Sequence, residues 1–491
     1  MGKYSSFRTN DCNRKMIAFY WLLRTTDKVE GYARMHYIGD YIYDSDRLIF
    51  YERDMPEHVI KKVKECIEVS DYYEKLRSGY ECLDKNNMSA KGKHIDLIGV
   101  CLTYNCQLRC NYCSYSSTSG NYNDLDTKDV LAFVVEAIKI RMIYQMAHHV
   151  VYDKPLRFFF TGGGEPTFDW NLFEKTVCAI KKKCEEYSIP CYLELTTNGM
   201  LNDNQRSFVI DHFNKVMVSY DGIAEIQNKN RKCANTTESS KTVEESIRAF
   251  MESKLFLVVR TTVWHEDFVA LKEIYNNLAK NYAAIDEWSI MPILPSGRAL
   301  VNAKPGQYDI NQKNFFDYYI ELIEYVQNQE TGLYISSAVF NNSIVEYCCG
   351  ATFDECFWLM PDKTIVNCIE AERFKTEVGR IENDKVLFYD CYVDLYLDIV
   401  RDTFDNCRNC LAYRFCKGGC PLKTIRDEEY GTNYRKYECQ MIVQYWEYVF
   451  HKILRGGYCF GWGASQIEKD EFEGYKVFQL RDMERRKQDA D

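Results

Sequence analysis

The sequence of 491 residues predicts an α/β protein built around an open, partial (β/α)6 barrel. Two observations support this fold class. From Ile95 onward, six short runs rich in β-branched and aromatic residues alternate with segments of helical periodicity, a pattern that builds a parallel sheet with right-handed crossovers. Six units are also fewer than the eight of a closed barrel, so the sheet is expected to stay open. The flanking segments follow other patterns and are predicted to be separate regions.

Residues 1–93 are predicted to form an α+β module. The segments 15–23 and 35–43 have the composition of strands, and 56–77 places apolar side chains at helical spacing. A polar linker at 84–93 ends the module. Strands followed by a helix over this length indicate a small domain with its own core.

The barrel is predicted to occupy residues 94–310. Its strands are expected at 95–103, 156–161, 191–197, 215–220, 255–263 and 287–294. The helices between them are expected at 127–145, 172–187, 203–212, 242–252 and 268–280. In parallel sheets of this kind, reactive side chains gather at the carboxyl ends of the strands.

Three further regions follow the barrel. Residues 311–345 are predicted to be a linker helix and a bridge. Residues 346–450 contain ten of the 22 cysteines and are expected to be irregular, with metal rather than a large core holding them together. Residues 451–491 form a C-terminal extension, whose charged end from Arg481 onward is expected to be solvated.

The composition limits the classes of partner and the compartment. The net charge is −10 and no long Lys/Arg run is present, so nucleic acid is not an expected partner. No apolar run reaches the roughly 18 residues of a membrane span, so no membrane contact is expected. Many cysteines in a long chain without a signal-peptide pattern indicate a reducing, cytoplasmic setting.

Three cysteines directly after the first barrel strand carry the first functional signal. Cys106, Cys110 and Cys113 are spaced by four and three residues, too close together for disulfides among them. Grouped thiolates are ligands for a soft metal or an iron–sulfur cluster. Three ligands on a four-iron cluster leave one iron open for chemistry. The segment 162–166, Gly-Gly-Gly-Glu-Pro, follows the second strand and should lie at the same mouth of the barrel.

The CxxxCxxC motif followed by Gly163-Gly164-Glu165-Pro166 resembles the radical S-adenosylmethionine (radical SAM) superfamily. The resemblance implies a partial barrel of the radical SAM type, in which the three cysteines hold a [4Fe–4S] cluster. The open iron would bind the amino and carboxylate groups of SAM, and one electron would release a 5′-deoxyadenosyl radical that takes a hydrogen atom from the substrate.

The resemblance also assigns residues around SAM. Tyr112 would line the adenine pocket or shield the cluster. Gly163 and Gly164 would let the backbone approach the ligand closely, and Glu165 with nearby carbonyls would accept hydrogen bonds from the SAM ammonium group. Pro166 completes this motif.

Two later segments resemble the "TNG" and "S-x-DG…R" segments of the branch that modifies peptides and proteins. Thr197 and Asn198 end the third strand, and they would contribute to the ribose end of the SAM site. Ser219 and Arg231 would contact the SAM carboxylate, which the fork of an arginine can bind with two hydrogen bonds. Arg260, on the fifth strand, is a possible substitute for Arg231.

The cysteines after the barrel are similar to the SPASM extension, which carries two auxiliary [4Fe–4S] clusters and would bring the total to three. By position, one cluster would have the ligands Cys349, Cys356, Cys368 and Cys420, and the other Cys407, Cys410, Cys416 and Cys439. Cys348 is an alternative to Cys349, and Cys391 has no assigned role. A zinc site is the alternative for any single CxxC pair.

The resemblance implies a maturase of ribosomally synthesised precursor peptides. The expected product is a thioether crosslink, with a carbon–carbon crosslink, or formylglycine formation as in anaerobic sulfatase-maturing enzymes, as alternatives. Those enzymes place an Asp after the ligand equivalent to Cys368. Here Ile369 follows, and Glu370 is the candidate base. Residues 1–93 would be a winged-helix element that pairs the leader peptide with a sheet edge, or a structural lid. A flavodoxin- or ferredoxin-type protein would supply electrons. The non-enzymatic alternative is an iron–sulfur electron carrier or scaffold.

Overall fold

A computed structural model of the chain describes residues 35–45, 48–66, 95–118, 125–149, 154–234, 238–302, 307–329, 333–340, 356–370, 377–389, 407, 410–455 and 467–480. The chain divides into two compact units. The first consists of Met1–Ser70 and Ile467–Arg481, and the second of Asp71–Gln466 and Asp482–Asp491. Each unit is described by itself.

The larger unit is built on a sheet of 11 strands in the order β10-β9-β8-β7-β6-β5-β4-β11-β12-β13-β14. All six predicted barrel strands are present and pair in parallel with their neighbours in sequence. They are β4 (Leu97–Val100), β5 (Leu156–Phe160), β6 (Cys191–Thr197), β7 (Lys215–Ser219), β8 (Phe256–Val263) and β9 (Glu287–Pro292). The predicted α/β class with a central parallel sheet is therefore confirmed.

The sheet continues on both sides of the six predicted strands. β10 (Tyr334–Ser337) pairs in parallel with β9. On the other side, β11 (Cys356–Leu359) pairs in parallel with β4 and is followed by the antiparallel strands β12 (Thr364–Val366), β13 (Gly379–Glu382) and β14 (Lys385–Phe388). The cysteine-rich region is thus continuous with the barrel sheet, which the predicted domain boundaries did not foresee.

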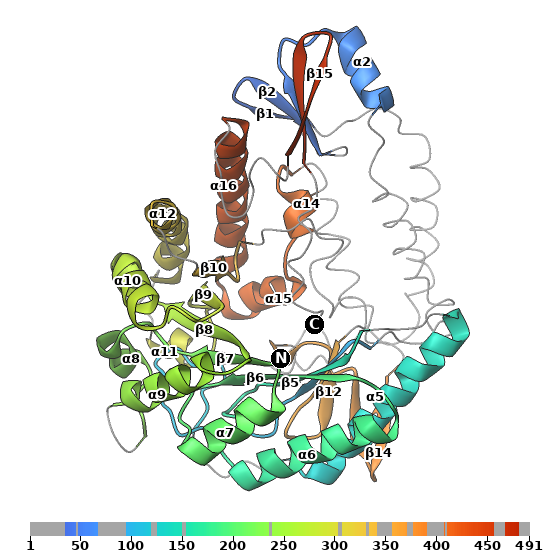
Figure 1. Ribbon diagram of the computed structural model, residues 1–491, viewed down its shortest axis with the longest axis vertical. Coiled ribbons are helices and arrows are strands. Elements are labelled where there is room, and N and C mark those ends of the chain that lie inside the picture. The colour runs from blue at the N-terminus through green and yellow to red at the C-terminus, as the bar shows by residue number, and fades with distance from the viewer. Residues whose placement is uncertain are drawn as a thin grey trace. The chain divides into compact units, whose positions relative to one another are not determined.

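Helices cover the outer face of the parallel strands (Figure 1). They are α5 (Thr127–His148), α6 (Trp170–Glu186), α7 (Asp203–His212), α8 (Ala224–Asn230), α9 (Ser240–Met251), the 3-10 helix η2 (His265–Ala270) and α10 (Leu271–Asn281). The outward side chains of β5 are fully buried, and Phe160 packs edge-on against Phe173 of α6. The inward side chains of β5 are less buried, and Phe159 among them packs against Trp358.

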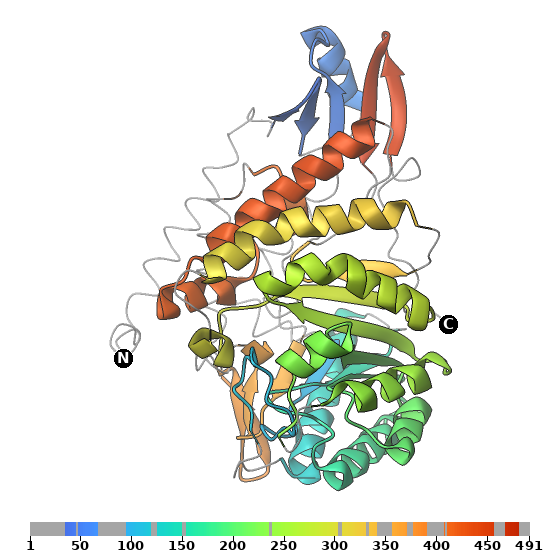
Figure 2. The same cartoon turned by 90° about the vertical axis from the view of Figure 1, so that its left-hand side faces the viewer.

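Helices also follow the barrel, both where the sequence predicted a linker helix after residue 311 and where it predicted irregular structure from residue 346 onward. After the short α11 (Arg298–Asn302), α12 (Gln307–Gln327) lies beside α16 (Tyr434–Leu454) (Figure 2), and Phe340 stacks on both Phe315 and Tyr445 between them. Two further helices are α14 (Tyr413–Cys416) and α15 (Pro421–Tyr430). The expectation of an irregular region is therefore wrong from residue 421 onward. The buried residues of α16 recur at helical spacing, and this pattern predicts the helix although the region is rich in cysteine.

The smaller unit combines both ends of the chain. Its five-stranded sheet has the order β1-β2-β3-β16-β15, and α2 (Glu57–Cys66) packs on it. The strands are β1 (Met35–Ile38), β2 (Tyr41–Asp44), β3 (Ile49–Glu52), β15 (Ile467–Phe472) and β16 (Tyr475–Leu480). The segment predicted as one strand at 35–43 is instead a hairpin, because Gly39 adopts a positive φ at the turn.

Part of the C-terminal extension is therefore a strand pair of the N-terminal module. β16 pairs with β3, and Val477 is buried with Ile49, Tyr51 and Val59. The predicted strand at 15–23, the predicted helix beyond Cys66, the linker at 84–93 and the tail from Arg481 lie outside the described residues.

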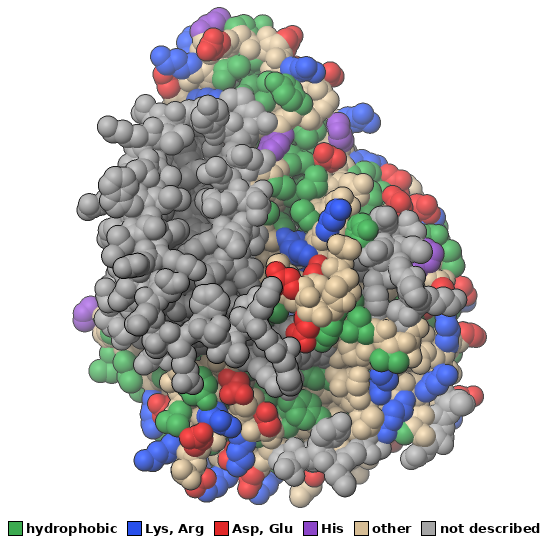
Figure 3. Space-filling view, turned by 180° about the vertical axis from the view of Figure 1, so that it is seen from behind, with side chains coloured by type: hydrophobic (Ala, Val, Ile, Leu, Met, Phe, Trp, Pro, Cys, Tyr) green, Lys and Arg blue, Asp and Glu red, His purple; other side chains and the backbone are tan. Residues whose placement is uncertain are grey.

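Charged side chains of both signs are interspersed over the described surface on the face drawn in Figure 3. Within the part of the chain that the structure describes, no helix is both long and apolar enough to cross a membrane.

Candidate functional site

The loop with Cys106, Cys110 and Cys113 follows β4 at the carboxyl end of the parallel strands. Backbone hydrogen bonds fix it from one side, with Arg109 N–H donating to the Lys232 carbonyl at 2.7 Å and Asn111 N–H to the Asn230 carbonyl at 2.8 Å. Arg298 fixes the other side, because its Nε donates to the Cys110 carbonyl at 2.8 Å and its backbone N–H to the Cys113 carbonyl at 2.9 Å. The loop is therefore held by two distant segments of the chain, residues 230–232 and Arg298.

The thiols of this loop fit the ligands of a cationic cluster. Burial raises the pKa of Cys110 to about 11, and burial together with the nearby Glu165 raises the pKa of Cys106 further. A buried thiolate needs a compensating positive charge, and binding iron supplies one while releasing the proton. The Leu108 N–H donates to Cys106 Sγ at 3.4 Å, and the Asn198 side-chain amide donates to the same sulfur at 3.7 Å. Hydrogen bonds to cluster sulfurs are one way in which a protein tunes such a site.

The glycines after β5 bring two loops of the chain together. A Cβ atom at Gly164 would lie 2.2 Å from the Asn105 carbonyl oxygen, and one at Gly163 would lie 2.4 Å from the ring of Tyr104. No side chain fits at these distances. The side of each glycine on which a side chain would lie thus faces the cysteine loop. The expected close approach of the glycine backbone to a ligand stays a prediction.

The Glu165 carboxylate accepts hydrogen bonds from neighbours in the chain. Its Oε1 accepts hydrogen bonds from Thr167 Oγ1 at 2.7 Å and Thr197 Oγ1 at 2.8 Å, and its Oε2 accepts one from the Asn198 N–H at 2.7 Å. Burial raises its pKa although these hydrogen bonds act in the opposite direction. The structure thus shows a role of this carboxylate within the chain, and its expected hydrogen bonds to SAM stay a prediction. Glu165, followed by the buried Pro166, ties the loop after β5 to the loop after β6.

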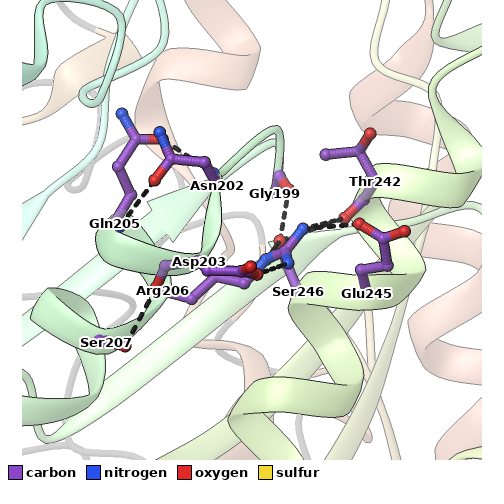
Figure 4. A network of polar contacts seen from close by, with 9 residues as sticks. All are labelled: Gly199, Asn202, Asp203, Gln205, Arg206, Ser207, Thr242, Glu245 and Ser246. Atoms are coloured by element: carbon purple, nitrogen blue, oxygen red, sulfur yellow. Dashed lines mark hydrogen bonds and ion pairs between the residues drawn. The ribbon is translucent and has the colours of Figure 1, made fainter.

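The turn after β6 is supported from below by a buried arginine. Ser246 Oγ donates to the Gly199 carbonyl at 2.7 Å, and Arg206 Nε donates to Ser246 Oγ at 3.1 Å (Figure 4). Arg206 also forms ion pairs with Asp203 and Glu245. This network, which the sequence analysis did not identify, fixes Thr197 and Asn198 relative to α7 and α9.

Tyr112, Asp221 and Arg231 form a buried polar group. The Tyr112 hydroxyl donates to one oxygen of Asp221, and Arg231 Nε donates to the other at 3.0 Å. The guanidinium of Arg231 lies 5.2 Å from the centre of the Tyr112 ring. Tyr112 also packs with Trp264 beside Cys110, and its expected role in the adenine pocket or as a shield of the cluster stays a prediction. Asp221, the acidic residue of the S-x-DG segment, is thus the partner of both groups.

Ser219 and Arg260 lie side by side on the inner face of the barrel. They are register partners on β7 and β8, and the outward neighbours Val259 and Thr261 are fully buried. Arg260 Nε is buried and has no hydrogen-bond partner among the described residues. Burial lowers the pKa of Arg260, and the nearby positive charge of Arg231 acts in the same direction. Two arginines facing this part of the barrel make it suited to an anionic group of a ligand.

Four of the cysteines after the barrel meet around one cavity. Cys407, Cys410, Cys416 and Cys439 line it together with Arg435, and about 250 Å³ inside it is free of protein atoms and partly open to solvent. These are the four cysteines that the sequence assigned to one auxiliary cluster. Burial raises the pKa of Cys416 and of Cys410. The donor set and the shared cavity fit an iron–sulfur cluster.

The other predicted ligand set is described only in part. Cys368 and Cys420 pack on the same apolar cluster, which includes Trp358 and Leu422, and Cys356 Sγ donates to the Asn367 carbonyl at 3.1 Å. The remaining cysteines of this region, Cys348, Cys349 and Cys391, lie outside the described residues. Among the residues that are described, no three His, Cys, Asp or Glu side chains converge as the ligands of a single ion would.

Glu370 does not stand free as a base. Its Oε2 accepts a hydrogen bond from Arg426 at 2.8 Å, and the Arg426 side chain is only 2% exposed. Two other nitrogens of Arg426, Nε and Nη1, are buried without hydrogen-bond partners among the described residues. The structure therefore places the Glu370 carboxylate in an ion pair with a buried arginine, and the catalytic role expected for Glu370 stays a prediction.

Comparisons with known proteins agree with this site. Residues 100–276 match the family model of the Radical SAM superfamily. A cysteine-type anaerobic sulfatase-maturating enzyme of Clostridium perfringens is 24% identical over 360 residues, which cover 71% of this chain and 94% of that protein. Another, from Clostridium novyi, is 22% identical over 363 residues, covering 71% and 93%.

Among solved structures, native anSMEcpe with bound AdoMet has a similar fold, with a TM-score of 0.52 and 20% identity over 72% of this chain and 96% of that chain. The cysteine loop at the mouth of the parallel sheet and the family match over that sheet lead to one conclusion. Residues 100–276 form a radical SAM domain, and the chain is a radical SAM enzyme whose cofactors are S-adenosylmethionine and [4Fe–4S] clusters.

Proposed function

We propose that this enzyme is a SPASM-type maturase that crosslinks a ribosomally synthesised peptide by joining a substrate cysteine to a carbon atom as a thioether. The observation that carries the proposal is the cavity lined by Cys407, Cys410, Cys416 and Cys439. It supports an auxiliary cluster in addition to the SAM cluster, and a crosslinking enzyme needs such a second redox centre.

The clusters would be held by three sets of cysteines. Cys106, Cys110 and Cys113 would bind the SAM cluster, and the four cysteines of the cavity one auxiliary cluster. The second auxiliary cluster would use Cys356, Cys368 and Cys420 together with Cys349 or Cys348. Support for this last set comes from Cys368 and Cys420, which lie on one apolar cluster that also includes Cys101 at the end of β4.

The carboxylate of SAM would lie at the anionic site inside the barrel. Ser219, Arg260 and Arg231 surround this position from three neighbouring segments. Asp221 holds Arg231 by its Nε, which leaves the two terminal nitrogens for a ligand.

The overall reaction loses two hydrogens from the peptide. When bound, SAM and its cluster supply a radical that takes a hydrogen atom from a C–H bond, and an auxiliary cluster supplies the acceptor for the electron released when carbon and sulfur join. The thiol proton leaves to solvent, so atoms and electrons balance. A flavodoxin- or ferredoxin-type protein would donate the electron that starts each turnover.

The substrate class draws support from the relatives. They are cysteine-type maturating enzymes, and a solved structure of anSMEcpe contains AdoMet and the Cp18Cys peptide, with a TM-score of 0.52 and 21% identity to this chain. A polypeptide substrate with a reactive cysteine is therefore proposed for this enzyme as well. The smaller unit would receive the leader of the peptide. Because β3 already pairs with β16, an added strand would have to use β1 or β15, the edge strands among the described residues.

The second candidate is formylglycine formation, favoured by the names of the relatives. It is less well supported because Glu370, the available candidate for a base after Cys368, is paired with Arg426. The two functions differ in the fate of sulfur. A thioether keeps the sulfur and loses two hydrogens, whereas formylglycine replaces the cysteine sulfur with oxygen.

The test is mass spectrometry of a precursor peptide co-expressed with the enzyme under anaerobic conditions. A product lighter by two hydrogens, which no longer reacts with a thiol-alkylating reagent, supports the thioether. A product without sulfur supports formylglycine formation instead. An enzyme variant with Cys106, Cys110 and Cys113 changed to Ala is the control, and modification by this variant would contradict the radical mechanism.

A further inference from the structure

Three charged side chains form a continuous chain beside the cavity with four cysteines. Glu438, which precedes Cys439 on α16, accepts a hydrogen bond from Lys423 and lies 3.7 Å from Arg435 Nη1. The side chain of Glu438 is 3% exposed, and those of Lys423 and Arg435 are 17% and 16% exposed. One buried negative charge thus stands between two positive charges.

Arg435 is the member of this chain that reaches the cavity. Its guanidinium is part of the cavity wall, and its Nη2 donates to the Gly418 carbonyl. The neighbouring Gly419 has a positive φ of 75°, and a Cβ atom there would lie 2.6 Å from Arg435 Cζ. A glycine is therefore required for the guanidinium to occupy this position. Arg435 Nη1 is buried and makes no hydrogen bond to any described residue.

The charge of Arg435 acts on the cysteines as a group. Its guanidinium lies in the wall of the same cavity as Cys407, Cys410, Cys416 and Cys439. At 3.7 Å, the contact with Glu438 is an ion pair without a hydrogen bond, so Glu438 offsets the positive charge only in part. The uncompensated remainder faces the cavity, in a setting of low dielectric where charges interact strongly.

We propose that Arg435 raises the reduction potential of the auxiliary cluster held by Cys407, Cys410, Cys416 and Cys439, with Glu438 as the opposing charge. Reduction adds one negative charge to the cluster, and a fixed positive charge in its wall stabilises that reduced state. This inference rests on the auxiliary-cluster assignment in the proposed function. Its consequence for that function is directional, because a cluster of higher potential more readily takes the electron released when the crosslink closes.

The test is a redox titration of the auxiliary clusters followed by electron paramagnetic resonance. The protein is the full chain with Cys106, Cys110 and Cys113 changed to Ala, so that the SAM cluster does not contribute to the signal. In this background, Arg435→Gln is expected to lower one midpoint potential, and Glu438→Gln is expected to raise the same one. Arg435→Lys keeps the charge and is expected to restore most of the original potential.

Lys436→Gln is the matched control, because Lys436 is the next residue of α16 and is exposed to water. Solvent screens its charge, so no shift is expected. Shifts of opposite sign from Arg435→Gln and Glu438→Gln separate an electrostatic role from general damage, which would move both in one direction.

Unchanged midpoints in Arg435→Gln, or shifts of the same sign in the two variants, would overturn the proposal while leaving the cluster assignment intact. Iron analysis of the protein that lacks Cys106, Cys110 and Cys113 distinguishes a wrong role for Arg435 from a wrong auxiliary-cluster assignment. If it retains less iron and sulfide than two [4Fe–4S] clusters contain, the auxiliary-cluster assignment is wrong, and the role of Arg435 is wrong with it.

Discussion

The Tyr115 hydroxyl donates a hydrogen bond to the backbone carbonyl of Ile369. Tyr115 lies two residues after Cys113 of the SAM-cluster loop, and Ile369 directly follows Cys368 of the proposed auxiliary site. The ring of Tyr115 also lies in the apolar cluster that contains Cys368 and Cys420. One side chain thus connects the two cysteine loops that a crosslinking reaction would use together.

Tyr115→Phe keeps the ring and removes this connection. We expect the unfolding free energy of the reconstituted protein to fall by about 1 kcal/mol, the usual net value of one hydrogen bond. We also expect more 5′-deoxyadenosine to be released per crosslink formed, because the two loops lose their common anchor. Denaturant unfolding and the ratio of nucleoside to product measure the two effects. An unchanged ratio together with unchanged stability would show that the hydrogen bond has no functional role.

The close contact between the glycine segment and the cysteine loop leads to a second prediction. Gly164→Ala would place a methyl group 2.2 Å from the Asn105 carbonyl, so the cysteine loop must move. We expect reduced iron incorporation at the SAM cluster and a loss of reductive SAM cleavage, measured by iron analysis and by 5′-deoxyadenosine release.

Gly431→Ala is the matched control for this variant. Gly431 ends α15 with a positive φ of 62° and has open space where a Cβ atom would lie. Alanine in the left-handed conformation costs about 1 kcal/mol, so stability should fall while iron content stays unchanged. Equal iron content in both variants would contradict the importance of the contact at Gly164.

The sequence was sufficient to predict elements that depend on local pattern. The strands β4 to β9 were recognised from their apolar runs, and the four cysteines around the cavity were grouped by their resemblance to the SPASM extension. Features that depend on distant segments could not be predicted in this way. β10 is a four-residue strand with two serines, and its pairing with β9 is decided by tertiary packing.

The same distinction between local pattern and contacts of distant segments applies at the candidate site. The glycines and Glu165 were identified as special positions, and the structure adds contacts with Asn105, Tyr104 and Asn198 that the motif does not reveal. A motif shows that a position is constrained, whereas only the folded structure shows which atoms meet there. Glu370 is the clearest case, because the pairing with Arg426 brings together residues 56 positions apart in sequence.

A pair of cysteines away from the site leads to a prediction of pH dependence. Cys184 near the end of α6 interacts with Cys191 at the start of β6, and this interaction lowers the pKa of Cys191 from 9.0 to about 7. Because the thiolate is the reactive form, the rate of alkylation of Cys191 should rise with a midpoint near neutral pH. Cys184→Ala removes this interaction, so the midpoint of the alkylation profile of Cys191 should move to higher pH.

Peptide-resolved mass spectrometry after brief treatment with iodoacetamide measures this profile. Cys178, which is exposed on the same helix, serves as the internal reference in each sample. If the pH profile of Cys191 alkylation is the same with and without the Cys184 thiol, the interaction between the two thiols does not control the reactivity of Cys191.

The pairing of β3 with β16 predicts that the C-terminal hairpin stabilises the N-terminal module. Val477 is 1% exposed in the core that also contains Ile49, Tyr51 and Val59. Val477→Ala leaves a small cavity there and should lower the stability of the smaller unit by about 2 kcal/mol. Lys476→Ala, at the exposed neighbouring position of β16, is the control and should have little effect.

Hydrogen exchange of the amides in β2 and β3 reports on this unit specifically. The radical chemistry lies in the other unit, so 5′-deoxyadenosine release should be the same in both variants. Faster exchange in Val477→Ala together with a loss of peptide crosslinking, but not of SAM cleavage, would assign the substrate-binding step to the smaller unit. Unchanged exchange would contradict the pairing of the two chain ends.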